Sequence, residues 1–353
     1  MMKESIAIIY GGKSAEHEVS LLTAKSIINA INKNKYRVFP IFISNKGEWA
    51  RGEEIVKDIK NESQLIYSDY NKNISELLYI NDKKMDLVFP VLHGPNGEDG
   101  TIQGLLEIMN IPYVGNKVLS SATGMDKSIM KKLFSIAKLP QLPYYDFLNN
   151  EWINNKENII TVLQKRIGFP MFIKPANMGS SVGITKAHND IELIEGINLA
   201  FKYDRKVVIE KGLSAIKEIE VAVLGTAKNS DATYPGEIIN ISSTEFYDYK
   251  TKYTNGKSKM EIPANIDNNL YEKFMDMAKI AFDSIDANGL ARVDFFLTEK
   301  NEIYINEINT MPGFTPFSMY PLLWKNMGLS YSNLIEKLIK LAKITFDEKN
   351  NLL

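Results

Sequence analysis

The sequence predicts an α/β fold that begins with a Rossmann-like domain and continues with an α+β region. Up to about residue 120, apolar strand-like runs alternate with a helical pattern, and the runs end at glycines. This alternation is typical of an open, mostly parallel sheet. After about residue 205 strand-like runs dominate, which predicts an α+β second half.

The Rossmann-like part is predicted from a strand, a helix and two more strands in that order. These segments are residues 5–12, 15–32, 36–44 and 85–94. Apolar residues of the helical segment keep the spacing of one helix face, at Leu21, Ala24, Ile28 and Ile31. Ligands of such sheets bind beyond the carboxyl ends of strands, where Gly11-Gly12 and His93-Gly94 fall. Residues 50 to about 80 are polar and irregular, so we expect a peripheral insertion there.

A new pattern starts near residue 120. One helix is predicted over residues 121–137, followed by a strand, a glycine-serine loop and a strand within residues 169–188. A helix is expected at about residues 190–202. Further strands are predicted at residues 205–213, 217–225, 233–241 and 291–309, and an amphipathic helix at 332–346.

The composition is that of a globular protein with more than one domain. The 353 residues are 44% hydrophobic and 24% charged, and the formal net charge of −1 argues against a nucleic-acid-binding surface. The chain has no cysteine, which excludes disulfides, zinc–thiolate sites and thiol nucleophiles. No apolar run approaches the roughly 20 residues of a membrane span, and no signal-peptide pattern is present. We therefore expect a cytoplasmic protein without membrane partners.

The end of the 291–309 region carries an unusual pair of carboxylates. If these residues form a hairpin that turns at Lys300-Asn301, residues whose numbers sum to 601 lie opposite each other. Asp294 then faces Glu307, and Arg292 faces Asn309. Ile303 and Ile305 are expected on the same face as Glu307, because alternate strand residues share a face. Directly opposed carboxylates repel each other, so either a divalent cation lies between them or Arg292 neutralises them at a solvated hairpin end.

Several other polar groups have a functional and an ordinary explanation. Residues 174–183 form a glycine-serine loop that begins with Lys174; it could wrap anionic oxygens, or it could be a flexible hairpin. Lys127 lies on an apolar helical stripe, where a long side chain often reaches solvent. His93 at a strand end could be structural. Residues 207–213 could be an interdomain connection, and residues 246–253 a surface loop.

Two familiar nucleotide motifs are not present. The segment GGKS at residues 11–14 resembles part of a P-loop, but the required earlier glycine is Ala7. No G-x-G-x-x-G follows the first strand, which argues against a nicotinamide-dependent oxidoreductase.

Taken together, the motifs resemble those of the ATP-grasp ligases, and within them the D-alanine–D-alanine ligases. The resemblance covers essentially the whole chain in the family's order. It rests on GGKSAEHEVSL, VFPVLHGPNGEDGTIQGLLE, MDK, FIKPANMGSSVGI, VIEKGL, FYDYKTKY, ARVDFF and INEINTMPGFTPFSMYP. It implies a Rossmann-like N-terminal domain (1–122), then a two-lobed ATP-grasp domain with a central lobe (123–213) and a C-terminal lobe (214–353).

The resemblance also implies roles in nucleotide and metal binding. Lys127 and Lys174 would contact ATP phosphates, and the loop with Gly179, Ser180, Ser181 and Gly183 would close over them. The remaining implied nucleotide contacts are Glu210, Lys211 and Leu213 at the adenine, Glu218 at the ribose, and Phe246 and Lys252. Asp294, Glu307 and Asn309 match ligands of two Mg²⁺ ions, for which Mn²⁺ can substitute. Activation by K⁺ is common in the family, so the resemblance also implies K⁺ as a further cofactor.

The implied reaction joins two D-alanines through a D-alanyl phosphate. Arg292 and the backbone N–H of Gly313 would stabilise the oxyanion. Glu16, with Ser180 and Tyr253, would hold the first substrate's ammonium, and His93 would lie nearby. The implied contacts of the second substrate are Lys252, Ser318 and Met319, and the segment with Lys252 and Tyr253 would form a lid.

Three alternatives remain open at this stage. Relatives that make D-alanyl-D-lactate generally lack the YDYKTKY type of segment, and relatives that use D-serine often carry arginine at the Met319 position. Since the sequence shows neither departure, D-alanine is favoured as second substrate, although Phe317 replaces a residue that is often histidine. A nucleotide-binding protein without catalytic activity is the third alternative. The resemblance further implies a homodimer.

Overall fold

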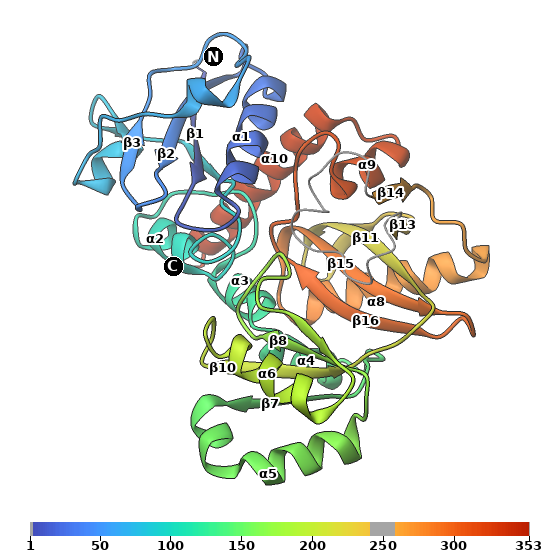
Figure 1. Cartoon of the computed structure of the whole chain (residues 1–353). Helices are drawn as coiled ribbons and strands as arrows, with labels where there is room; N and C mark the ends of the chain where they lie inside the picture. The colour runs from blue at the N-terminus through green and yellow to red at the C-terminus, as the bar shows by residue number, and fades with distance from the viewer. Residues whose placement is uncertain (1–2, 241–257, 353) are drawn as a thin grey trace.

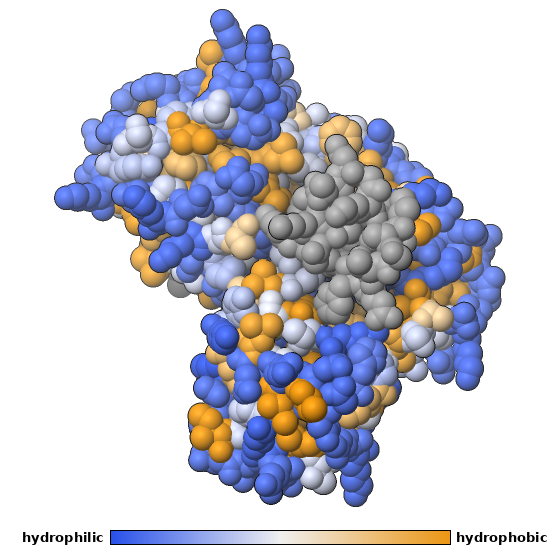
Figure 2. All heavy atoms as spheres, in the orientation of Figure 1, coloured by the Kyte–Doolittle hydropathy of each residue, from blue (hydrophilic) through white to orange (hydrophobic). Residues whose placement is uncertain are grey.

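The computed structural model describes residues 3–240 and 258–352. Within them, three sheets of four or more strands follow one another along the chain, each accompanied by helices (Figure 1). This arrangement confirms the predicted combination of a Rossmann-like part with a strand-rich second half. On the face shown in Figure 2, hydrophilic residues predominate and apolar residues form scattered groups. No helix among the described residues is both long and apolar enough to cross a membrane.

The first sheet is the predicted Rossmann-like layer. Its strand order is β3 (Trp49–Arg51), β2 (Tyr36–Ile43), β1 (Glu4–Gly11), β6 (Leu87–Pro90). β1 pairs in parallel with β2 and β6, because the helix α1 (His17–Ala30) and the segment before β6 carry the chain back to the same edge. The helix α2 (Thr101–Ile108) follows β6. All three predicted strands and the first helix are therefore confirmed.

The segment between β3 and β6 is less peripheral than predicted. It contains two 3₁₀ helices and a small hairpin: η1 (Glu62–Leu65), η2 (Ile74–Leu78), β4 (Tyr79–Ile80) and β5 (Lys83–Lys84). Leu65 and Leu78 are fully buried in the core beside the first sheet. The apolar residues of this segment thus close the core of the first domain.

The C-terminal helices return to the N-terminal part of the chain. α9 (Met319–Asn326) and α10 (Tyr331–Asn350) contribute buried side chains to the same core as β1 and α1. Leu334 and Leu338 of α10 share this core with Ile6 and Ile28, and α10 lies beside α1 (Figure 1). The predicted amphipathic C-terminal helix is confirmed, and its apolar face is covered by residues of β1 and α1 from the beginning of the chain.

The helix predicted over residues 121–137 is two helices, so that prediction is wrong. α3 (Val118–Met125) ends at Asp126, whose ψ of 99° is extended, and α4 (Lys127–Ile136) begins directly after it. The Asp126 side chain accepts hydrogen bonds from the backbone N–H groups of Ser128 and Ile129. Asp126 thereby caps α4 and lets the chain change direction.

The second sheet has the order β7 (Tyr144–Leu148), β10 (Lys206–Lys211), β8 (Met171–Pro175), β9 (Thr185–Ala187). All of its pairs are antiparallel. The helices α5 (Asn149–Arg166) and α6 (Asp190–Ala200) contribute to its core. The predicted strand, loop and strand within residues 169–188, and the helix after it, are confirmed.

The third sheet contains the hairpin that carries the acidic residues. Its order is β14 (Ser258–Glu261), β13 (Gly236–Asn240), β11 (Ile216–Thr226), β15 (Asn288–Thr298), β16 (Ile303–Asn309), and β12 (Asn229–Ala232) also pairs with β11. One face packs on α8 (Tyr271–Ser284), which follows the short η3 (Asn268–Leu270).

The predicted hairpin register is right at the acidic end and wrong at the turn. Asp294 pairs with Glu307 and Arg292 with Asn309, but Phe295 pairs with Ile305. Asn306 is therefore the extra residue of a β-bulge. The extra residue shifts the alternation of side chains along β16. Ile305 is therefore buried in the core with Phe295 and does not share a face with Glu307.

The three predicted domains remain a proposal. Each sheet lies within one of the proposed segments, but the boundary at 122/123 falls inside α3. The returning α10 also makes the core of the first domain depend on the end of the chain.

Candidate active site

The acidic end of the hairpin is organised around Arg292. Its Nε and Nη2 donate to the two carboxylate oxygens of Asp294, both at 2.7 Å, and the amide of Asn309 donates to the same carboxylate at 2.9 Å. Burial lowers the pKa of Arg292, but Asp294 and its acidic neighbours raise it well above its ordinary value. Among the described residues, these two bonds engage Nε and Nη2 of Arg292 and not its Nη1.

A third carboxylate lies in the same row. Glu220 on β11 pairs with Asp294 on β15, which in turn pairs with Glu307 on β16. One oxygen of Glu220 lies 3.0 Å from the Nε of Arg292. Glu220 and Asp294 therefore contact one arginine, and Glu307 adds a third carboxylate to the row. This concentration of negative charge suits a cation.

Opposite the acidic row lies a group of lysines from α4 and β8. Lys131 and Lys174 place their Nζ atoms 3.4 and 3.1 Å from the same oxygen of Glu210. Lys131 and Glu210 are only 1% and 3% exposed at their side chains. Burial raises the pKa of Glu210, but the two lysines outweigh burial and hold it below its ordinary value.

Lys127 connects the lysine group with the acidic row. Its Nζ lies 3.7 Å from an oxygen of Glu307 and donates to the carbonyl of Met178 at 2.9 Å. The Nζ of Lys174 donates to Oδ1 of Asn306, the bulge residue, at 3.3 Å. Side chains of the second sheet, the third sheet and α4 thus meet at one place.

The residues present fit a nucleotide with a divalent cation. Oε1 of Glu210 is buried without a hydrogen-bond partner in the described structure, as expected for an atom that receives a donor from a ligand. No group of three acidic, histidine or cysteine side chains that could hold a metal alone is found among the described residues. Mg²⁺ typically combines one or two carboxylates with substrate phosphates, so the donor set of the hairpin is of the right kind.

The glycine-serine loop reaches the N-terminal domain. Ser180 donates a short hydrogen bond to Oε1 of Glu16. A methyl group at Gly179 would lie 3.4 Å from Oε2 of Glu16, and one at Gly94 would lie 2.7 Å from it. Ser180, Ser181 and Gly183 all have positive φ. The predicted contact between Glu16 and Ser180 is therefore observed in the structure.

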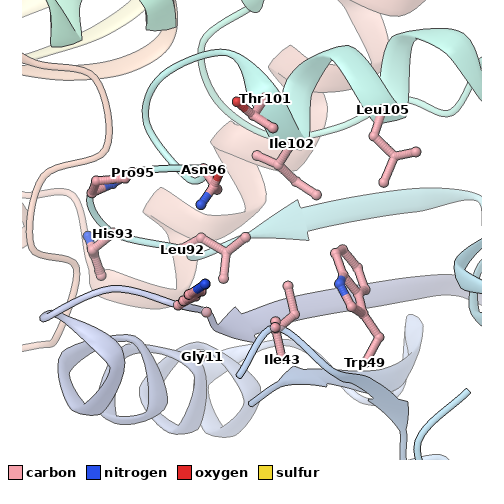
Figure 3. Close-up of a pocket in the computed structure, with 13 residues that line it drawn as sticks. Gly11, Ile43, Trp49, Leu92, His93, Pro95, Asn96, Thr101, Ile102 and Leu105 are labelled. Carbon is pink, nitrogen blue, oxygen red and sulfur yellow. The ribbon is translucent and has the colours of Figure 1, made fainter. Parts of the chain in front are cut away.

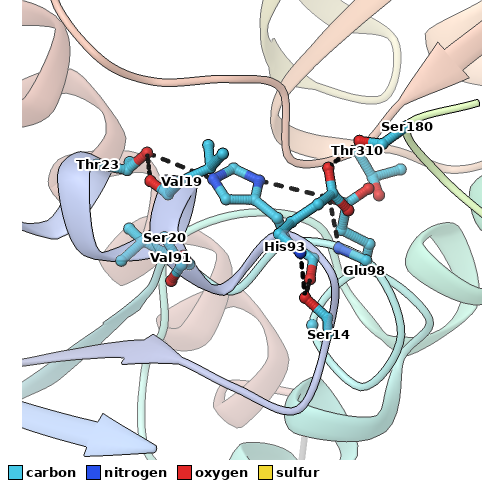
Figure 4. A network of polar contacts seen from close by, with 12 residues as sticks. Ser14, Val19, Ser20, Thr23, Val91, His93, Glu98, Ser180 and Thr310 are labelled. Carbon is cyan, nitrogen blue, oxygen red and sulfur yellow. Dashed lines mark hydrogen bonds and ion pairs between the residues drawn. The ribbon is translucent and has the colours of Figure 1, made fainter. Parts of the chain in front are cut away.

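His93 lies in a buried polar network next to Glu16. Its ring contacts Thr23 on one side, at 3.4 Å from Nε2, and Glu98 on the other, at 3.5 Å from Nδ1 (Figure 4). Its backbone carbonyl accepts a hydrogen bond from Ser14. Burial lowers the pKa of His93, but Glu98 and Glu16 raise it by a larger amount, so the net change is upward.

His93 also borders a cavity of about 270 Å³, which lies at the carboxyl ends of the strands of the first sheet. Gly11, Gly12 and His93 line it, as expected from the position of these residues after strands. Its walls are mostly apolar, and Ile102 and Leu105 face Trp49 across it (Figure 3). Its lining does not include the lysine group or the acidic row.

The remaining predicted nucleotide residues lie along β10 and β11. Lys211 donates to the carbonyls of Gly168 and Phe169, so its side chain fixes a neighbouring loop. Leu213 is half-buried between the strands, and Glu218 pairs with Phe296 of β15. Their contacts to ATP remain predictions.

The predicted residues of the second substrate lie after β16. Gly313 is half-buried in the loop that follows this strand. The hydroxyl of Ser318 lies 2.8 Å from that of Thr315, at the beginning of α9. Met319 is 3% exposed and belongs to the core. Phe246, Lys252 and Tyr253 lie outside the described residues.

The sequence interpretation missed Lys131, Glu220 and Asn306. Lys131 follows Lys127 by four residues, so both lie on one face of α4. Glu220 follows Glu218 by two residues and shares its face of β11. These spacings could have identified the first two, whereas the bulge at Asn306 has no clear signal in the sequence.

Comparison with known proteins gives matches along nearly the whole chain. A family model described as D-ala D-ala ligase N-terminus matches residues 5–116, and one described as D-ala D-ala ligase C-terminus matches residues 133–340. The D-alanine--D-alanine ligase of Macrococcus caseolyticus is 54% identical over 355 residues, which cover 100% of this chain and 99% of the relative.

Solved structures are similar over the same length. The VanG D-Ala:D-Ser ligase of Enterococcus faecalis has a TM-score of 0.82 and 37% identity, covering 97% of this chain and 100% of that structure. The D-alanine-D-alanine ligase of Coxiella burnetii has a TM-score of 0.81 and 30% identity, covering 100% and 97%. With these matches, the chain belongs to the D-alanine–D-alanine ligase family.

Proposed function

We propose that this chain joins two D-alanines into D-alanyl-D-alanine, with ATP converted to ADP and phosphate, for peptidoglycan precursor synthesis. The observation that carries the proposal is that Lys127 and Lys174 both reach the acidic hairpin, Lys127 at Glu307 and Lys174 at the neighbouring Asn306. This arrangement places cations beside carboxylates that can bind a metal, as transfer of a phosphoryl group requires.

In the first step, a carboxylate oxygen of one D-alanine attacks the γ-phosphorus of ATP. The bond from that phosphorus to the oxygen of ADP breaks, which gives D-alanyl phosphate and ADP. Lys127 and Lys174 neutralise the charge on the phosphate oxygens, and the loop of Gly179 to Gly183 covers them. Positioning and charge neutralisation carry most of such a transfer, so no protein nucleophile is required.

We infer that Asp294, Glu307 and Asn309 hold two Mg²⁺ ions, and that Mn²⁺ can replace them. A divalent cation held by these residues would supply positive charge to the phosphate oxygens of ATP. Arg292 holds the Asp294 carboxylate in place for this role through two hydrogen bonds of 2.7 Å. K⁺ is a further candidate activator, on the resemblance alone.

In the second step, the neutral amine of the other D-alanine attacks the acyl carbon, and the bond from that carbon to the phosphate oxygen breaks. Phosphate leaves, and the nitrogen gives up one proton as the amide forms. Arg292 and the N–H of Gly313 stabilise the oxyanion that forms. Loss of one such donor typically lowers the rate about 10²–10³-fold. The site must exclude water, because the acyl phosphate would otherwise hydrolyse.

The ammonium of the first D-alanine is held by Glu16, with Ser180 and Tyr253 as its partners and His93 nearby. The short contact from Ser180 to Glu16 supports this assignment. Ser318 and Lys252 bind the carboxylate of the second D-alanine. Since Met319 is buried, we expect it to shape the second site by packing beneath it instead of contacting solvent.

D-serine is the second candidate for the second site, because a D-Ala:D-Ser ligase is among the similar structures. D-lactate is the third candidate. The near-complete match to D-alanine--D-alanine ligases at above 50% identity favours D-alanine. A homodimer and a cytoplasmic location are part of the proposal; they are consistent with a family whose substrates are ATP and D-alanine.

The test is ADP release with Mg²⁺-ATP and D-alanine, L-alanine, D-lactate plus D-alanine, or D-serine plus D-alanine, with products identified by mass. D-alanine alone should give ADP and the dipeptide. If a mixed product forms in preference to the D-alanine dipeptide, the second substrate is D-serine or D-lactate instead of D-alanine. No ADP under any condition would overturn the ligase function.

A further inference from the structure

We propose that Lys131 is a positioning residue that fixes Glu210 as the acceptor for the 6-amino group of adenine, and thereby sets the preference for ATP. This inference rests on the nucleotide site of the proposed function. It gives a role in nucleotide specificity to a buried lysine for which the sequence motifs imply no role.

Lys131 forms its ion pair with the carboxylate of Glu210 in the described structure. Its side chain is 1% exposed, and its Nζ lies 3.4 Å from Oε2 of Glu210 and 3.5 Å from the carbonyl of Asn306. The ring of Tyr144 lies 5.5 Å from the same Nζ. A lysine so enclosed cannot exchange partners with solvent, so it acts as a fixed counter-ion.

Glu210 uses its two oxygens in different ways. Both lysines contact Oε2, whereas Oε1 is buried without a hydrogen-bond partner in the described structure. A buried oxygen without a donor is costly, so this atom is expected to receive one from a ligand. An ionised carboxylate only accepts hydrogen bonds. It therefore selects a base with an amino group and disfavours one with a carbonyl oxygen at that position.

The two lysines are not interchangeable. Lys174 also donates to Asn306 and is expected to contact the phosphates, so it has a second partner once ATP binds. Lys131 lies deeper and keeps its contact with Glu210. When Lys174 turns toward phosphate, Lys131 becomes the group that keeps Glu210 ionised and correctly oriented.

The experiment compares ATP with purine riboside triphosphate, which lacks only the 6-amino group. In Lys131→Met, Glu210 is no longer held in position to accept the hydrogen bond from the 6-amino group of adenine. The KM for ATP should therefore rise about tenfold or more, because a hydrogen bond to a charged acceptor is lost. The KM for purine riboside triphosphate should change much less, and kcat at saturation should stay within about threefold. Lys131→Arg should retain most of the preference.

The matched control is Lys132→Met on the same helix. Lys132 is half exposed and paired with Asp146, so its replacement should leave the nucleotide preference unchanged. In a Glu210→Gln background, Lys131→Met should have little further effect on the preference. An equal rise of KM for both nucleotides in Lys131→Met, or an unchanged preference, would overturn the proposal.

Direct binding of the two nucleotides, measured by calorimetry, separates this proposal from the proposed function. If the wild-type chain forms no dipeptide but binds ATP better than purine riboside triphosphate in a Lys131-dependent way, the role of Lys131 stands while the ligase function fails. If the dipeptide forms but Lys131→Met binds both nucleotides as the wild type does, the ligase function stands and this proposal fails.

Discussion

The acidic row of the third sheet and the lysine group beside the second sheet are both made of ion pairs, yet they differ in burial. The side chains of the acidic row (Glu220, Asp294 and Glu307) are 12% to 24% exposed; the first two contact Arg292 and the third contacts Lys127. In the lysine group, Lys131 and Glu210 are almost completely enclosed.

This difference separates binding from stability. Partly exposed carboxylates can exchange a protein partner for a ligand at low cost, so they suit a site that takes up and releases a cation. A fully buried pair strongly destabilises the fold when one partner is removed, because an uncompensated charge remains. We therefore expect substitutions in the acidic row to affect activity, and substitutions of buried members of the lysine group to affect stability as well.

The largest effect is expected for Glu307→Gln. Loss of this carboxylate should reduce kcat for ADP formation by about 10²–10³-fold, since charge stabilisation of the transition state is lost. The melting temperature measured by circular dichroism should remain close to that of the wild type. Glu299→Gln, at the exposed turn of the same hairpin, is the control and should retain full activity. Near-normal turnover of Glu307→Gln would contradict the metal assignment.

The next effect is on stability. Glu210→Ala leaves Lys131 and Lys174 without their carboxylate and should lower the free energy of unfolding by about 3–5 kcal/mol. Urea denaturation followed by fluorescence measures it. Asp146→Ala removes the partner of the half-exposed Lys132 and should cost about 1 kcal/mol or less. Equal costs for both variants would contradict the expectation that the burial of an ion pair determines its effect on stability.

A smaller effect is expected for Glu220→Gln. This change keeps the shape of the side chain but weakens its 3.0 Å contact with Arg292. The kcat for dipeptide formation should fall about tenfold, because Arg292 is less well oriented, while the KM for ATP stays the same. Steady-state kinetics with ATP and D-alanine varied separately measure both. A rise in the KM for ATP without a change in kcat would assign Glu220 to the nucleotide instead.

The smallest effect is a pH dependence from His93. Its folded-state pKa lies above the ordinary value of 6.5, so its contribution to stability is complete below about pH 6.5 and is lost as pH rises through the folded-state pKa. The stability difference between the wild type and His93→Gln should therefore shrink from pH 6 to pH 9. His188→Gln, at an exposed position, should show no such trend. If the stability difference between the wild type and His93→Gln grows with pH, the pKa of His93 is not raised in the folded state.

Much of the fold and the site could be predicted from the sequence because the signals are local. Continuous apolar runs identify β1 and β2, and alternation identifies the hairpin. The predicted pairing of Asp294 with Glu307 is observed, but it results from a turn shifted by one residue together with the bulge at Asn306. The cap at Asp126 is also local, so the break between α3 and α4 could have been recognised from an aspartate before Lys127-Ser128. The contacts of Phe246, Lys252 and Tyr253 lie outside the described residues and stay predictions.

The sequence by itself determined which residues carry charge at strand ends and, through its family motifs, which reaction they serve. The tertiary structure decided which charges meet. Lys131 pairs with Glu210 79 residues later, and α10 completes the core of the first sheet, because burial of apolar surface brings these distant segments together. The bulge at Asn306 likewise depends on packing of Ile305 against the core. Such contacts leave no periodic pattern, since each depends on the position of a whole element.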